Sequence, residues 1–145
     1  MASIFTRIIR AELPARFVWR DELCVVFLSN RPLRPGHALV VPREEIDHWL
    51  DADPSLLSHL TSTAQMIGRA QMAAFHPARV GMLIAGLEVP HLHIHVVPIR
   101  DMRDLDFANQ DPDPDREMMD AAAESIRREL RALGFTEAAD SRTGG

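Results

Sequence analysis

The chain contains no lysine, so arginine supplies all sixteen of its permanently cationic side chains. A lysine Schiff base and the phosphate-binding lysine of a P-loop are therefore excluded. A phosphate group would have to be held by histidine, arginine, hydroxyl or backbone N–H groups. The one cysteine, Cys24, excludes an intrachain disulfide. It lies in an apolar stretch, and we interpret it as a small core residue rather than a nucleophile.

Long apolar runs are also absent. No stretch approaches the roughly 20 apolar residues of a membrane-spanning helix, and the apolar part of the N-terminus is too short and too charged for a signal peptide. The net charge of -5 at pH 7 argues against a broad nucleic-acid surface, which needs clustered basic residues. It does not exclude a small phosphorylated ligand. We expect a cytoplasmic protein that binds neither nucleic acid nor membranes.

Apolar periodicity predicts five short strands, at residues 17–19, 24–28, 37–41, 80–85 and 92–99. Three helices are predicted: a short one that ends before Pro14, a long one capped by Asp53, and a last one that starts near residues 113–114. Residues 101–114 read as an exposed connection. Because long helices do not alternate regularly with strands, we expect an α+β fold with a mostly antiparallel sheet. We expect one domain over residues 1–136 and a disordered tail over residues 137–145.

The most informative segment is an alternation of histidine with aliphatic residues at positions 91–96. Alternate side chains of a strand share a face, so His91, His93 and His95 are expected on one face and the aliphatic residues on the other. Three imidazoles on one face bring no obvious gain in packing. The pattern therefore indicates a functional site more strongly than a solvated strand face.

Two kinds of site remain for this pattern. In a metal site, His91 and His95 would lie about 13 Å apart along the strand, whereas a Zn–N bond is only about 2 Å long. This spacing weighs against one ion binding all three. Two of them could share a metal, but the sequence shows no obvious further ligand cluster. In a phosphate site, a central imidazole attacks and its neighbours donate hydrogen bonds to phosphate oxygens. Histidine suits this chemistry because its pKa lies near neutrality.

The segment resembles the His-φ-His-φ-His-φ-φ signature (φ being apolar) of the histidine-triad, or HIT, family. Residues 30–42 resemble a second element of that family, Pro-x-x-Pro-Gly-His-x-Leu-Val-hydrophobic-Pro, and residues 4–19 resemble its opening. The similarity covers roughly residues 3–99. The branch most similar to the chain is the Hint group, whose members cleave P–N bonds of nucleoside phosphoramidates. A histidine rather than a glutamine at position 95 resembles the hydrolase branches.

The resemblance implies roles for four histidines. His93 would be the nucleophile that takes up the nucleotidyl group, and His95 would contact phosphate oxygens. The carbonyl of His91 would fix the tautomer of His93. His37 would complete the cluster from the neighbouring strand, although it could also be a surface residue at the end of a loop.

The resemblance also implies a nucleotide pocket. The expected lining residues are Phe27, Leu28, Ser29, Asn30, Glu88 and Val89. Phe27 could equally be plain core. The family often has aspartate where Ser29 stands, so Ser29 would make a weaker contact with the ribose. Leu87 replaces a glutamine of the family, and Glu88 could point away, bind the leaving group or assist proton transfer.

The resemblance implies a homodimeric hydrolase of nucleoside 5′-phosphoramidates or related AMP derivatives, with a covalent nucleotidyl-histidine intermediate. The alternatives are a dinucleoside polyphosphate hydrolase of the same family and a non-catalytic protein that binds purine nucleotides. No cofactor is expected. Some relatives hold zinc with two cysteines and a histidine, whereas this chain has Ser3, Thr6 and Glu45 at those places. We therefore expect no metal.

Overall fold

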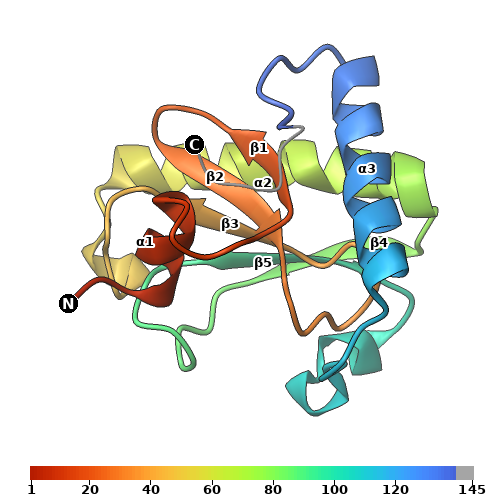
Figure 1. Ribbon diagram of the computed structural model, residues 1–145, viewed down its shortest axis with the longest axis horizontal. Helices are drawn as coiled ribbons and strands as arrows, with labels where there is room; N and C mark the ends of the chain where they lie inside the picture. The colour runs from red at the N-terminus through yellow and green to blue at the C-terminus, as the bar shows by residue number, and fades with distance from the viewer. Residues whose placement is uncertain (140–145) are drawn as a thin grey trace.

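The computed structural model describes residues 1–139. Its elements follow in the order α1 (Ile4–Ile9), β1 (Phe17–Arg20), β2 (Cys24–Leu28), β3 (Ala38–Pro42), η1 (Trp49–Asp51), α2 (Pro54–Phe75), β4 (Arg79–Leu83), β5 (Ile94–Ile99), η2 (Met102–Leu105), η3 (Phe107–Asn109) and α3 (Arg116–Ala132). The elements labelled η are short 3₁₀ helices. The strands form one antiparallel sheet in the order β1-β2-β3-β5-β4 (Figure 1). The predicted α+β class with a five-stranded antiparallel sheet is confirmed.

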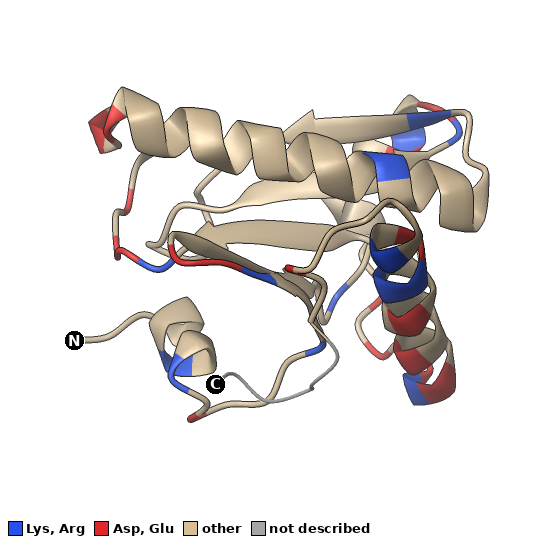
Figure 2. Cartoon of the chain, turned by 90° about the horizontal axis from the view of Figure 1, so that it is seen from above, with Lys and Arg blue, Asp and Glu red and all other residues tan. Residues whose placement is uncertain are grey.

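The sheet separates two apolar cores. The long helix α2 covers one face, and the short helix α1 lies on the other side of the sheet (Figure 2). Strand alternation divides the side chains between the two cores: Val26 and Val40 pack on the α2 side, whereas Phe27 and Leu39 pack on the α1 side. Because Leu39 is the register partner of His95, the histidine shares the α1 face. His95 therefore lies on the face of the sheet where α1 packs, opposite the long helix α2.

Local signals explain where the long helix begins and ends. The Asp53 side chain accepts a hydrogen bond from the Ser55 N–H, and Pro54 occupies the first turn, as predicted. The helix ends at His76, whose φ of 50° is left-handed, and Pro77 follows. On the same face of the sheet, Cys24 is fully buried in the core, as expected of a small apolar residue.

The C-terminal part of the chain differs from the prediction in two places. Helix α3 begins at Arg116, and Asp115 caps it through a hydrogen bond from the Met118 N–H, so the predicted start near residues 113–114 was too early. The expected disordered tail began at residue 137. Instead, Ala138 forms a bridge with Trp19 of β1, which gives this part of the tail backbone partners. The rest of that tail, residues 140–145, lies outside the described residues. None of the helices within residues 1–139 is long and apolar enough to cross a membrane.

Candidate active site

The three histidines of the alternating segment lie together on the α1 face, but only His95 belongs to a regular strand. We predicted a strand from residue 92, whereas β5 begins at Ile94. The reason is local. The His91 ring, rather than a backbone N–H of β5, bonds to the Pro42 carbonyl oxygen, with its Nε2 2.8 Å away. The Leu92 N–H donates to the Ile46 carbonyl at 2.6 Å. The backbone before Ile94 is therefore held by a side chain and a loop rather than by the sheet.

Hydrogen bonds fix the tautomer of His93. Its Nδ1 lies 2.7 Å from the His91 carbonyl oxygen, which can only accept, so Nδ1 carries the proton. In the neutral ring, Nε2 then holds a free lone pair. Phe5 of α1 packs edge-on against this ring, with the ring centroids 5.0 Å apart. The predicted carbonyl contact between His91 and His93 is thus present, and it leaves a nucleophilic nitrogen.

A second hydrogen-bond chain fixes His37 and His95. The Leu33 N–H donates to His37 Nδ1 at 3.0 Å, so His37 Nε2 carries a proton and points it at His95 Nδ1, 2.9 Å away. His95 Nε2 must then be the protonated nitrogen of a neutral ring. His37 is fully buried, which excludes the alternative of a surface loop histidine. The site therefore has a hydrogen-bond donor on His95 beside the lone pair of His93, their ring centroids 4.9 Å apart.

Burial keeps all four histidines neutral near pH 7. Loss of hydration, together with the nearby imidazoles of His95 and His93, lowers the pKa of His37 to about 3. Burial likewise lowers the pKa of His95 to about 4, with His93 adding to the effect. Burial also lowers the pKa values of His91 and His93. For His93, the hydrogen bond to the His91 carbonyl and the charge of Glu88 partly oppose this shift of the pKa.

The residues at the expected zinc positions form a hydrogen-bonded cluster around His91. Ser3 Oγ lies 2.6 Å from His91 Nδ1. The Glu45 carboxylate accepts from the Ser3 N–H at 2.7 Å and from the Thr6 hydroxyl at 2.6 Å. Since His91 Nε2 donates to the Pro42 carbonyl, a neutral His91 accepts the Ser3 proton at Nδ1. The cluster joins α1 to the loop after β3 and to the histidine segment.

This cluster does not fit a structural zinc ion. Such sites are built from thiolates and imidazoles, whereas Ser3 and Thr6 offer hydroxyls that are already hydrogen-bonded to His91 and Glu45. The hydrogen bond from the Ser3 backbone N–H, together with that from the Thr6 hydroxyl, lowers the pKa of the Glu45 carboxyl group to about 2. The carboxylate is therefore charged in its role as an acceptor.

Another group with metal-ligand chemistry lies on the opposite face of the sheet. One ligand atom each of Asp21, Cys24 and His59 lies within 4.8 Å of the others. Asp21 accepts hydrogen bonds from the Trp19 indole and the His59 ring, and from backbone N–H groups including that of Leu23. Burial raises the pKa of the Cys24 thiol to about 12, so the thiolate that a metal needs is disfavoured. We interpret this group as the anchor of the turn between β1 and β2.

A hollow of about 180 Å³ opens beside His93 and His95. Apolar side chains such as Phe5 of α1 and Phe27 of β2 line it. Phe27 is both core and pocket wall, being 2% exposed. Polar residues, Arg31 among them, also line it. All the residues predicted to bind the nucleotide line this hollow: Phe27, Leu28, Ser29, Asn30, Glu88 and Val89.

A second hollow, of about 160 Å³, lies on the other side of the same histidines. It shares Glu88, His93 and His95 with the first, and Leu87 and Phe107 are part of its wall. Each volume alone is smaller than the ~300 Å³ at which small-ligand pockets begin. Because they share three residues, the two hollows form two halves of one cleft, with the reacting histidines between them.

Some lining residues were missed in the sequence. Residues 101–114 were expected to be an exposed connection, but Phe107 of η3 packs edge-on against His95 at 4.9 Å between ring centroids. Gln110, from the same region, and Met119, from α3, line the first hollow beside His93 and His95. One signal existed, since Phe107 is the only aromatic residue in that polar stretch. For Gln110 and Met119 we find no comparable signal.

The fold and the four histidines define a histidine-triad site, and comparisons with known proteins agree. A family model for the HIT domain matches residues 10–102. Adenylylsulfatase HINT3 of Arabidopsis thaliana is 30% identical over 112 residues, which are 74% of this chain and 56% of that protein. The chain thus spans little more than half the length of that relative. An uncharacterized HIT-like protein of Synechococcus elongatus is 38% identical over 101 residues, 66% of this chain and 88% of that protein.

Solved structures show the same fold. A zinc-bound histidine-triad family protein from Mycobacterium smegmatis superposes with a TM-score of 0.80 and 28% identity, over 92% of this chain and 96% of that one. A Hit-like protein involved in cell-cycle regulation from Bartonella henselae gives a TM-score of 0.76 and 28% identity, over 88% and 95% of the two chains. The chain belongs to the histidine-triad family, and its fold is that of the solved histidine-triad structures.

The buried histidines predict a loss of stability in acid. In the unfolded chain they take up protons below about pH 6.5, whereas the folded pKa values of His37 and His95 are about 3 and about 4. The free energy of unfolding should therefore fall as the pH drops from 6.5 to 4, by up to about 1.4 kcal/mol per pH unit for each histidine. Urea unfolding at several pH values measures this slope. His37→Asn, which keeps an acceptor for the Leu33 N–H, should reduce the slope, and the exposed His48→Asn should not. Equal slopes in His37→Asn and wild type would contradict the assignment.

The cluster around Glu45 predicts a second effect. Glu45→Ala removes the acceptor for the Ser3 N–H and the Thr6 hydroxyl, so α1 loses its tie and the melting temperature should drop by a few degrees. Thermal melting checks this, with Glu44→Ala as the control because Glu44 is the exposed neighbour. Glu45→Gln keeps an acceptor oxygen and should fall between the two. Identical melting of the Glu45→Ala and Glu44→Ala variants would show that the cluster does not hold α1.

Proposed function

We propose that the chain hydrolyses nucleoside 5′-phosphoramidates or related AMP derivatives through a nucleotidyl intermediate on His93. One observation carries the proposal: the lone pair of His93 Nε2 and the N–H of His95 stand side by side where two hollows meet. A nucleophile and a donor for phosphoryl oxygens are the two groups that a phosphoryl-group transfer to histidine requires. A purine nucleoside would occupy the hollow that contains Phe27 and Ser29.

The proposed reaction has two steps. His93 Nε2 attacks the α-phosphorus, a P–N bond to the ring forms, and the bond to the leaving amine breaks. The amine takes a proton from within the histidine cluster. The new positive charge on the His93 ring is stabilised because its Nδ1–H donates to the His91 carbonyl. Water then attacks phosphorus, the bond to Nε2 breaks, and the proton that water loses returns to the histidine cluster, so that AMP and the neutral histidines are restored.

The leaving group separates the proposal from its alternatives. A dinucleoside polyphosphate hydrolase would release a nucleotide, and a binding protein would hold AMP without turnover of any derivative. The name of the Arabidopsis relative, an adenylylsulfatase, adds sulfate to the leaving groups to be tested. A panel on purified protein should therefore contain an adenosine phosphoramidate, diadenosine polyphosphates and adenylyl sulfate. AMP affinity should be measured beside it.

The role of His93 is tested by replacement. His93→Ala should reduce turnover of the phosphoramidate by more than about a hundredfold and leave AMP affinity within about threefold, because the lost bond forms only during the reaction. His48→Ala, at an exposed histidine of the loop before α2, serves as the control. Wild-type enzyme quenched during turnover should carry an acid-labile adenylyl group on His93 by mass spectrometry. An adduct on His37 or Glu88, or substantial activity in His93→Ala, would refute the mechanism.

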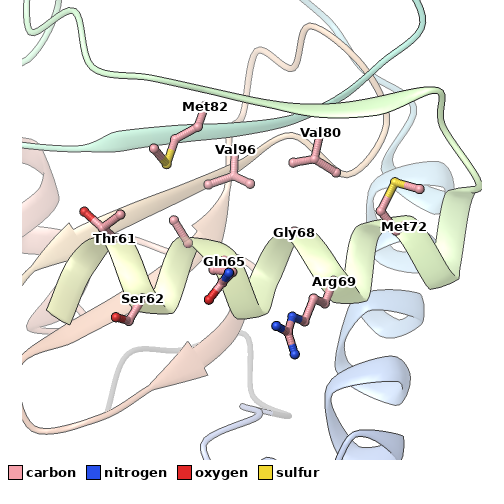
Figure 3. Close-up of a pocket in the computed structure, with 10 residues that line it drawn as sticks. Thr61, Ser62, Gln65, Gly68, Arg69, Met72, Val80, Met82 and Val96 are labelled. Atoms are coloured by element: carbon pink, nitrogen blue, oxygen red, sulfur yellow. The ribbon is translucent and has the colours of Figure 1, made fainter. Parts of the chain in front are cut away.

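We further propose that the chain is a homodimer in which β4 meets β4 of a second copy. Strand β4 is an edge of the sheet, whereas the other edge, β1, pairs in part with Ala138. A hollow of about 580 Å³ lies between β4 and α2, where Val80 lies near the helix residue Met72 and Met82 lies near Thr61 (Figure 3). Met82 and Met72 are 54% and 43% exposed. A twofold axis beside β4 would pair the two edges and cover these side chains.

The dimer proposal predicts a specific weak point. Met82→Arg places a charge in the contact and should weaken association by about tenfold or more. Sedimentation at micromolar concentration should show a wild-type dimer and a monomeric variant. Met102→Arg is the matched control, because Met102 is also an exposed methionine but lies on η2. A wild-type protein that sediments only as a monomer would exclude this assembly.

A further inference from the structure

The two halves of the cleft differ in charge. The nucleotide hollow is lined by two arginines, Arg16, which is ion-paired with Asp120, and Arg31, and it shares Glu88 with the second hollow. Among residues 1–139, no arginine lines the second hollow, and apart from the neutral His93 and His95 its only ionisable side chain is that of Glu88. An anion placed in the second hollow would therefore meet a carboxylate and no compensating cation.

The remaining wall of the second hollow is apolar. Ala85, Leu87 and Phe107 line it, and the Phe107 ring is held against His95. Leu87 is 93% exposed, so a large apolar side chain stands uncovered beside the reacting histidines. Such a surface favours a ligand with an aliphatic or aromatic body, because burying that body removes apolar area from water on both sides.

Glu88 is free to bind a ligand. Within the described part of the chain its carboxylate has no hydrogen-bond or ion-pair partner. It lines both hollows, so it stands at the point where the bond to the leaving group would break. Its negative charge reaches the reacting ring, since it acts to raise the pKa of His93.

We propose that the second hollow receives the leaving group and that Glu88 selects amines on an apolar stem, best with a positive charge, over anionic leaving groups. This inference rests on the proposed function and names its substrate class. When the P–N bond breaks, the bonding pair stays on nitrogen and a proton from the histidine cluster completes the amine. An alkylamine with a pKa near that of lysine, ~10.4, then takes a second proton from water. The resulting ammonium ion lies beside the Glu88 carboxylate, whereas a departing sulfate or phosphate would be repelled by it.

Three adenosine phosphoramidates of matched size test the inference. Their amines are 1,3-diaminopropane, propylamine and β-alanine, which add a positive charge, no charge and a negative charge. We expect kcat/KM to fall in that order, with about tenfold between the first and the last, because Glu88 is exposed to solvent and partly screened. Adenylyl sulfate should be cleaved less efficiently than the propylamine derivative. The difference should shrink as salt is raised.

Glu88→Gln is the decisive variant. It should bring the three kcat/KM values to within about twofold of one another, because the charge that distinguishes the three leaving groups is then gone. Glu44→Gln, at an exposed carboxylate after β3, should keep the wild-type order. Binding of the three compounds to His93→Ala, measured by calorimetry, should show the same charge order without turnover.

The outcomes separate the two proposals. Turnover in which the β-alanine derivative or adenylyl sulfate is preferred would overturn the leaving-group inference and leave the proposed function standing. Retention of the wild-type charge order in Glu88→Gln would overturn the role of Glu88. Absence of turnover for all three amines would refute the proposed function, and the inference that rests on it.

Discussion

The hydrogen bond from His93 Nδ1–H to the His91 carbonyl is the contact on which the site depends. It decides which nitrogen of His93 has the lone pair, and it requires that the His91 carbonyl be withheld from the sheet ladder. The strand can begin only at Ile94 for this reason. The His91 ring bonds to the Pro42 carbonyl oxygen and so replaces the backbone hydrogen bond that a longer β5 would have made there. The local irregularity of β5 is therefore a condition of the chemistry.

The position of His91 depends in turn on residues far away in the chain. Ser3 and Thr6 come from α1, and Glu45 comes from the loop after β3. A helix of six residues is not stable by itself in water, so α1 needs such contacts to stay in place. The same helix contributes Phe5 to the nucleotide hollow and packs that ring against His93. One cluster of hydroxyls and a carboxylate thus holds both the wall of the pocket and the orienting histidine.

The sequence was sufficient for the features that depend on local pattern. Alternation placed the triad on one face, and capping residues located the start of α2 at Pro54. It was insufficient where several local signals compete or where distant segments meet. Residues 111–115 contain three aspartates, any of which could cap a helix, and packing selects Asp115. The contact of Phe107 with His95 joins a 3₁₀ turn to β5 and has no periodic signature. The hydrogen-bonded cluster of Glu45, Ser3 and His91 joins residues up to 88 positions apart in the sequence, so no local pattern predicts it.

Neutral histidines give the cleft a particular electrostatic character. Because burial keeps His37, His93 and His95 uncharged near pH 7, the phosphoryl group meets directed N–H and lone-pair groups rather than a net positive field. Fixed dipoles of this kind need no reorganisation as charge moves during the reaction. Among the described residues that line the cleft, full charges come from Arg16 and Arg31 in the first hollow, Arg16 being paired with Asp120, and from Glu88, which both hollows share. The full charges of the cleft therefore come from residues outside the triad, and under the proposed function it is these residues that would distinguish one derivative of AMP from another.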